Sequence, residues 1–336
     1  VRAQDSRGNW GGTSHFTVRV APVAAVAVAG VDRIATAIEA AKIAFPGGAS
    51  TVVIATARNW PDALGGAALA GAVGGPILLT EPGALPTAVA TAISALGADK
   101  AIILGGTAAV SSAVESSLKT LLGAADVQRV QGADRYGTAR EVAAETVKRL
   151  GPGGYDGTAF VATGANFPDA LGGSPLAAAN GWPIYLVRPT GPDDALVQSM
   201  TSAGVDHMLV LGGTAVVSDS TKAALESRVG ATSERLAGAD RYATARVVAT
   251  YGVSDAGLAW HGVALATGTN FPDALAGGVL QGRARSVMLL TGPDVLYDGA
   301  RQALDDNSAV IWEIRFLGGT SAVSQAVRDA ALAALR

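Results

Sequence analysis

The chain of 336 residues contains no cysteine, which excludes disulfide bonds, thiolate metal sites and cysteine nucleophiles. Histidine is almost as scarce, with three residues in the whole sequence. There is no G-x-S-x-G nucleophile elbow, no H-E-x-x-H helix and no cluster of histidines with carboxylates. These absences remove the patterns of common hydrolases and zinc sites. We therefore predict a protein without catalytic residues, metal-ligand residues or cofactors.

Charge is also sparse, since 16% of the residues are charged and the formal net charge is -3. The basic excess that nucleic-acid binding usually requires is missing. Gly, Pro, Thr or a charged residue interrupts every apolar stretch before it reaches the length of a membrane span. What the chain does have is 49% hydrophobic residues and 43 glycines. This composition predicts parallel strands that are buried on both faces by helices of small residues.

Three motifs each occur three times, in the same order along the chain. The first is G-x-D-R-[IY]-x-T-A, at residues 30–37, 132–139 and 238–245. The second is A-T-x-x-N-[FW]-P-D-A-L, at residues 55–64, 162–171 and 266–275. The third is L-G-G-T-x-x-V-S, at residues 104–111, 211–218 and 317–324. Such self-similarity is the mark of a triplicated structural unit.

Between the motifs, short apolar runs alternate with alanine-rich stretches that have helical character. Examples of the apolar runs are TVVIATA at 51–57 and PILLT at 76–80. Runs of this length separated by helices are typical of βαβ units and a parallel sheet. We predict α/β repeats at 22–126, 127–232 and 233–336.

Residues 1–21 do not fit the repeat. Phe16, Val18 and Val20 alternate after a turn region rich in glycine, as in a hairpin. We expect this segment to be the end of an upstream all-β domain, immunoglobulin-like or fibronectin type III-like. The opening at Val1 predicts a mature or excised fragment, with any export signal elsewhere.

The ordered triplication resembles the cell wall-binding repeat 2 family of Gram-positive bacterial surface proteins, over roughly residues 23–336. The resemblance implies three Rossmann-like or flavodoxin-like parallel-sheet domains about a pseudo-threefold axis. It also implies a secreted, surface-located module that holds an exported protein non-covalently to an anionic secondary wall polymer, which is teichoic acid-like or a polysaccharide. Partners would then be this polymer and upstream domains of the same protein. The third copy departs from the pattern, because ARSVMLL at 284–290 replaces the Gly-Pro entry to the strand.

Two rival hypotheses remain open. The triple unit is alternatively a rigid, self-assembling piece of a surface layer. It is otherwise an enzyme that handles a sugar or a nucleotide, although neither G-x-G-x-x-G nor G-x-x-x-x-G-K-[ST] occurs. The Gly-Gly-Thr turns of the third motif are therefore expected to serve tight strand-to-helix packing.

The first motif places an arginine in the first turn of each expected helix, at Arg33, Arg135 and Arg241. A cation there opposes the helix dipole, so each arginine needs a compensating group. The alternatives are an acidic side chain of the same or a neighbouring copy, which we favour, and a bound phosphate or carboxylate. Arg58 and Arg188 follow strands, where open α/β sheets usually bind ligands. We predict these five arginines as the ligand-binding residues.

The remaining polar residues of the motifs have structural explanations. Asn followed by Pro and Asp suits a helix N-cap with proline in the first turn and an acidic partner. We therefore assign structural roles to nine motif residues, Asp32, Asp134, Asp240, Asn59, Asp62, Asn166, Asp169, Asn270 and Asp273.

Overall fold

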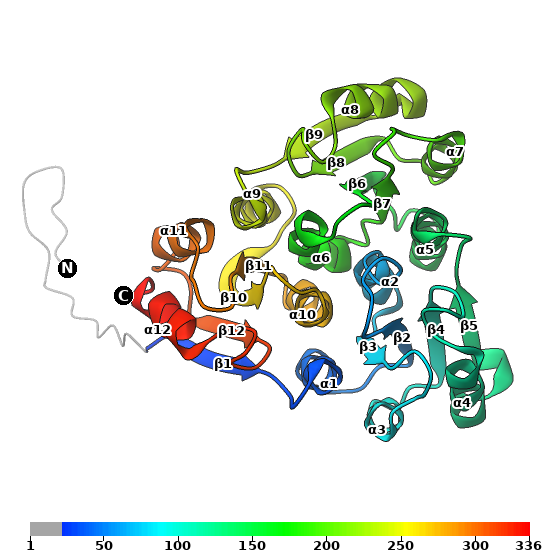
Figure 1. The fold of residues 1–336 in the computed structure, drawn as a ribbon, viewed down its shortest axis with the longest axis horizontal. Helices are drawn as coiled ribbons and strands as arrows, with labels where there is room; N and C mark the ends of the chain where they lie inside the picture. Colours follow the sequence, from blue (N-terminus) through cyan, green and yellow to red (C-terminus); the bar gives the residue numbers. More distant parts are fainter. Residues whose placement is uncertain (1–21) are drawn as a thin grey trace, which may run out of the picture.

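The computed structural model describes residues 22–336, which form three α/β units arranged in a ring (Figure 1). The expected hairpin at 1–21 lies outside the described residues. Each repeat contributes four strands and four α-helices in strict alternation. The first comprises β1 (Ala24–Val28), α1 (Arg33–Ala44), β2 (Thr51–Thr56), α2 (Gly66–Val73), β3 (Ile77–Thr80), α3 (Thr87–Ala95), β4 (Lys100–Leu104) and α4 (Ser112–Leu122).

The second repeat comprises β5 (Val127–Val130), α5 (Arg135–Leu150), β6 (Thr158–Thr163), α6 (Pro168–Asn180), β7 (Ile184–Val187), α7 (Asp194–Ser202), β8 (His207–Leu211) and α8 (Asp219–Leu225). The third comprises β9 (Thr232–Leu236), α9 (Arg241–Ser254), β10 (Ala259–Thr267), α10 (Pro272–Arg283), β11 (Ser286–Thr291), α11 (Asp298–Asp306), β12 (Glu313–Leu317) and α12 (Gln325–Ala333). The predicted alternation of strands and helices is confirmed.

The strands form three four-stranded parallel sheets, with orders β3-β2-β4-β5, β7-β6-β8-β9 and β1-β12-β10-β11. One edge strand of each sheet comes from another repeat: β5 of the second repeat completes the first sheet, and β9 of the third repeat completes the second. For the third sheet this strand is β1, whose Ala24 pairs with Glu313 and whose Val28 pairs with Leu317. The sequence repeats and the sheets are therefore offset by one strand, and the first strand of the chain closes the ring. The predicted fold class of three parallel-sheet units is confirmed.

Burial explains why the strand sequences are continuous apolar runs. Every residue of β2, β3 and β11 is buried. Both faces of these parallel strands are covered, as the composition indicated. None of the helices in the described part of the chain has the length and hydrophobicity that crossing a membrane would require.

Three helices, α2, α6 and α10, pack against one another at the centre of the ring (Figure 1). The first helix of each repeat lies between neighbouring units, since α1 packs on α10 of the third repeat and on β3 of its own. Small residues permit this close approach. A Cβ atom on Gly71 would lie 2.0 Å from the carbonyl oxygen of Ala178, and one on Gly282 would lie 2.6 Å from the Cβ of Ala178.

The contact between α2 and α6 generates a first prediction. Gly71→Ala forces a methyl group against the backbone of α6, so we expect the free energy of unfolding to fall by about 1–3 kcal/mol. Gly47→Ala is the matched control, because its Cβ meets no atom within 4 Å. Urea denaturation of both variants measures the difference. Equal stabilities would show that the central helices are not tightly packed.

Candidate functional site

The first motif builds the entry into α1, α5 and α9. Asp32 Oδ1 accepts a hydrogen bond from the backbone N–H of Ala35 at 2.8 Å, and therefore caps α1. The N–H of Gly30 donates to Thr36 Oγ1 at 3.1 Å, and a Cβ on Gly30 would lie 2.3 Å from that of Ala35. Asp134 and Asp240 cap α5 and α9 in the same way. The repeated glycine, aspartate and threonine thus form one helix-start structure.

The repeated arginine ties this helix start to a neighbouring strand. Arg33 Nη1 donates to the carbonyl oxygen of Ala57, just after β2, at 2.9 Å. Arg135 and Arg241 make the same bond to Gly164 and Gly268, at 2.9 and 2.8 Å. The ion pair that we favoured for these arginines is wrong, because among the described residues none of the three lies within ion-pair distance of a carboxylate. Part of each guanidinium is therefore occupied by the scaffold.

An aspartate from the preceding repeat completes two of these junctions. Burial raises the pKa of Asp169, whereas Thr244 and Arg241 of the next repeat act to lower it. Burial likewise raises the pKa of Asp273, against the opposing effects of Arg33 and Thr36. The repeated aspartate and arginine thus act on each other across repeats without a direct ion pair.

The Gly-Gly-Thr turns make room for these aspartates. Gly105, Gly212 and Gly318 have φ of 87°, 91° and 95°, a region that favours glycine. A Cβ on each would lie 2.7, 2.6 and 2.4 Å from Oδ2 of Asp62, Asp169 and Asp273, respectively. The first glycine of each turn therefore permits the close approach of a carboxylate as well as the turn itself.

The predicted asparagine caps are wrong. Helix α6 begins at Pro168 with Phe167 as its cap residue, and no side chain caps it. Asn166 Oδ1 instead accepts from the N–H of Phe167 at 2.9 Å, a local bond that competes with helix capping. Asn59 and Asn270 bond their following residues in the same way. These asparagines shape the loop before the helix.

The aromatic residue of the second motif has a role that sequence reasoning missed. The ring of Phe167 lies 5.8 Å from that of Trp60 and 6.2 Å from that of Phe271, between centroids. One aromatic residue per repeat thus joins a cluster shared by all three units. The aromatic residue that recurs at the [FW] position of the motif was the sequence feature that could have indicated this cluster.

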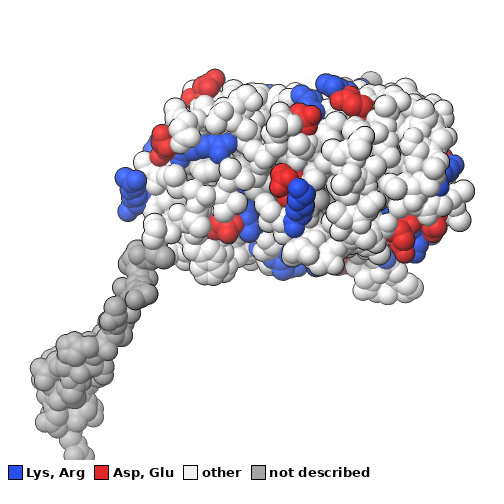
Figure 2. Space-filling model, turned by 90° about the horizontal axis from the view of Figure 1, so that it is seen from below, with Lys and Arg blue, Asp and Glu red and all other residues white. Residues whose placement is uncertain are grey.

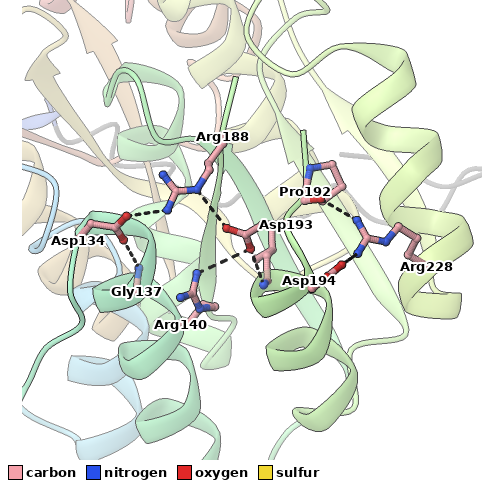
Figure 3. Close-up of polar contacts among 9 residues, drawn as sticks. Asp134, Gly137, Arg140, Arg188, Pro192, Asp193, Asp194 and Arg228 are labelled. Atoms are coloured by element: carbon pink, nitrogen blue, oxygen red, sulfur yellow. Dashed lines mark hydrogen bonds and ion pairs between the residues drawn. The ribbon is translucent and has the colours of Figure 1, made fainter. Parts of the chain in front are cut away.

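The two non-repeated arginines form ion pairs. Arg58 bonds Glu81 through Nε and Nη2, at 2.7 and 2.6 Å. Arg188 donates to Asp134 at 2.6 Å and to Asp193 at 3.1 Å (Figure 3). Both follow strands as predicted, but both have partners within the protein.

A groove of about 480 Å³ lies where the third repeat meets the first, at the carboxyl ends of the strands. It brings together five of the predicted residues, Asp32, Arg33, Arg58, Asn270 and Asp273. Arg135, Arg188 and Arg241 lie at other junctions. Sequence reasoning did not identify Thr269, Pro293 and Ser321, which also line the groove. Thr269 and Ser321 stand at variable positions of the second and third motifs, and Pro293 lies outside the motifs.

The electrostatic character of the groove is mixed, with guanidinium and carboxylate groups on the same walls. Asp273 Oδ1 is buried there without a hydrogen-bond partner. Figure 2 shows a similar mixture on the face that it displays, where acidic and basic side chains lie in small groups separated by broad uncharged surface. No group of acidic and histidine residues in the described chain is arranged to hold a metal ion.

The buried carboxyl group of Asp273 generates a second prediction. Because its folded-state pKa is raised, the folded protein holds this proton more tightly than the unfolded chain, and stability falls as the pH rises above the ordinary aspartate range. Asp273→Asn removes this cost. We expect the difference in melting temperature, variant minus unmodified protein, to increase as the pH is raised from about 4 to about 7. A difference that stays constant over this pH range would contradict the assignment.

Comparisons with known proteins agree with this architecture. The model of the family "Cell wall binding domain 2 (CWB2)" matches residues 27–115, 129–222 and 235–328. N-acetylmuramoyl-L-alanine amidase LytC of Bacillus subtilis (strain 168) is 30% identical over 302 residues, which are 90% of this chain and 57% of that protein. The amidase enhancer of the same organism is 29% identical over 282 residues, 83% of this chain and 36% of that protein. The chain thus spans less than two thirds of either relative.

Solved structures share the fold. Cwp6 from Clostridium difficile matches with a TM-score of 0.81 at 23% identity, over 99% of this chain and 51% of that one. Cwp8 from the same organism matches with a TM-score of 0.80 at 24% identity, over 93% and 51%. Three repeats that match one family model, each built on the motifs described above, decide the assignment. The chain belongs to the cell wall binding domain 2 family, and its three repeats form one ring-shaped cell wall-binding module.

Proposed function

We propose that this module anchors an exported protein to the bacterial cell wall by binding an anionic secondary wall polymer, without catalysis of its own. The observation that carries the proposal is the groove between the third and first repeats. It is formed by motif residues of two repeats at the carboxyl ends of parallel strands, which is the usual ligand position in open α/β sheets.

The chemistry of the groove suits a polymer that carries both hydroxyl and acidic groups. Arg33 and Arg58 supply guanidinium donors, and Asn270 and Thr269 supply neutral hydrogen-bonding groups. Asp32 and Asp273 disfavour a densely charged anion but accept hydrogen bonds from sugar hydroxyls. The mixture therefore favours a polysaccharide with separated acidic groups.

Repetition supplies strength to weak contacts. The three junctions share the capping aspartate and the strand-binding arginine, and two of them have a facing aspartate, so the polymer meets related surfaces around one ring. Binding at one junction raises the effective concentration of the polymer at the next. The combined binding of the three sites is then stronger than the binding of any single site. The matched region is only part of each relative, which supports the proposal that other parts of the full protein supply its activity.

A scaffold function is the second candidate. It is favoured by the fact that most repeated polar residues bond within the protein, as Asp32 and Arg33 do. A pure scaffold would self-associate and would not bind purified walls.

Sedimentation with purified Gram-positive cell walls tests the proposal. The full chain should co-sediment with intact walls and lose most of its retention after chemical removal of the anionic polymers from the peptidoglycan. Equal retention on both preparations would exclude the polymer as ligand. Self-association without any wall binding would favour the scaffold instead.

Arg58→Ala provides the residue-level prediction. The side chain is exposed and its ion pair is at the surface, so the melting temperature should change little. Wall retention should fall by about tenfold if the guanidinium contacts the polymer. Arg228→Ala is the matched control, because Arg228 forms a surface ion pair with Asp194 in the second repeat, away from the groove. Equal retention of the two variants would remove Arg58 from the binding surface.

A further inference from the structure

The loop after the third strand of each sequence repeat occupies the same place in all three units, but its key residues differ. The first residue after β3, β7 or β11 is followed by proline in every case, and the residue five positions further on is the N-cap of the next helix. The first set is Glu81, Arg188 and Gly292, and the second set is Pro86, Asp193 and Tyr297.

In the second repeat this place is filled by an ion-pair network (Figure 3). Arg188 lies over the ring of Tyr136, with its guanidinium carbon 4.0 Å from the ring centroid, and bonds Asp134 and Asp193. Arg140 approaches Asp193 to 4.0 Å. The charged groups thus satisfy one another, and the aromatic ring is covered by a side chain of the protein.

In the third repeat the same place has an aromatic stack. Gly292 stands where Arg188 stands in the second repeat, and the ring of Tyr297 lies on that of Tyr242, with centroids 3.9 Å apart and planes at 9°. A Cβ on Gly292 would lie 2.8 Å from Cε2 of Tyr297, so glycine leaves room for the ring. Tyr242 is 8% exposed, whereas Tyr297 is 40% exposed.

Because Gly292 replaces the arginine of the second repeat, an open cleft of about 460 Å³ lies between α9 and α11. Tyr297 and Val295 provide its exposed apolar surface, and Val295 is 54% exposed. Asp240, Arg246 and Gln302 provide the polar groups. Asp240 occupies the position at which Asp134 receives Arg188 in the second repeat, and in the third repeat no arginine stands at that position.

We propose that this cleft binds one non-ionised sugar ring, which packs on Tyr297 while its hydroxyl or acetamido groups bond Asp240 and Gln302. An aromatic face beside a carboxylate and an amide fits a pyranose, with its C–H face and equatorial hydroxyls. A phosphate fits poorly, because Asp240 and Asp298 are acidic and Arg246 is already held by Asp306 at 2.7 Å. The inference rests on the proposed binding of a wall polymer and specifies one part of it.

The cleft and the groove lie on either side of a single loop. Pro293 lines the groove, whereas Val295, Leu296 and Tyr297 line the cleft. One polymer chain that crosses this loop therefore reaches both, with its acidic groups near Arg33 and Arg58 and a neutral sugar on Tyr297. The third repeat would then contribute more than the second to selecting the polymer, because its cleft is open where the second repeat has a closed network.

Three variants of the full chain test the cleft by wall sedimentation. Tyr297→Ala removes the stacking surface and should weaken retention by about three- to tenfold. Tyr297→Phe keeps the ring and should retain binding within about twofold. Gly292→Ala displaces the ring of Tyr297 and should resemble Tyr297→Ala, with circular dichroism verifying that each variant is folded. Normal retention by both Tyr297→Ala and Gly292→Ala, while the unmodified protein binds walls, would overturn the cleft and leave the proposed function intact.

Saturation-transfer NMR tests the ligand class with defined probes, N-acetylglucosamine and glucose, against glucose 6-phosphate. Transfer to the ring protons of at least one neutral sugar is expected with the unmodified chain and not with Tyr297→Ala. Stronger transfer to glucose 6-phosphate than to either neutral sugar would overturn the neutral-sugar assignment. Trp312 is a second exposed aromatic residue of this repeat, at the opposite end of the strands. Loss of transfer in Trp312→Ala but not in Tyr297→Ala would also overturn the proposal.

Discussion

The structure depends on one exchange of strands. Each sheet is completed by a strand from the following repeat, and the last sheet is completed by β1, the first strand of the described chain. The bonds at its two ends run from the N–H of Ala24 to the carbonyl oxygen of Trp312 at 2.8 Å, and from the N–H of Gly318 to that of Val28 at 2.9 Å. Without this pairing, β12 would become an exposed edge strand of its sheet, and the groove would lose the wall that contains Arg33. Ring closure and the principal candidate site are therefore consequences of the same contact.

Much of the fold followed from the sequence, because its signals are local. The apolar strands, the glycine-rich turns and the three ordered motifs each depend on residues close together in the chain, such as Gly30, Asp32 and Thr36. The partner of β1 had no such signal, since β1 and β12 lie at opposite ends of the chain. The asparagine caps failed for a local reason: Asn166 bonds the neighbouring N–H before the helix begins.

The candidate site was less accessible to sequence reasoning than the fold. The repeated arginines were identified, but their main-chain partners depend on where each helix meets a neighbouring strand. The cleft beside Tyr297 depends on a missing side chain, at Gly292, and motif comparison records what is shared between repeats rather than what is absent from one. Repeats that are equivalent as scaffold have thus diverged at the surface, with an ion-pair network in the second and an aromatic stack in the third.

The parallel pairing of β1 with β12 also has a mechanical consequence. The groove lies at the carboxyl ends of the strands, whereas the chain enters β1 at Ala24, at the opposite end. If the proposed polymer occupies the groove and a load is attached before Ala24, the tension between them is directed along the strand. The hydrogen bonds between β1 and β12 are then loaded together in shear and do not open one at a time. A strand that closes the ring in this direction is suited to carry a sustained pull.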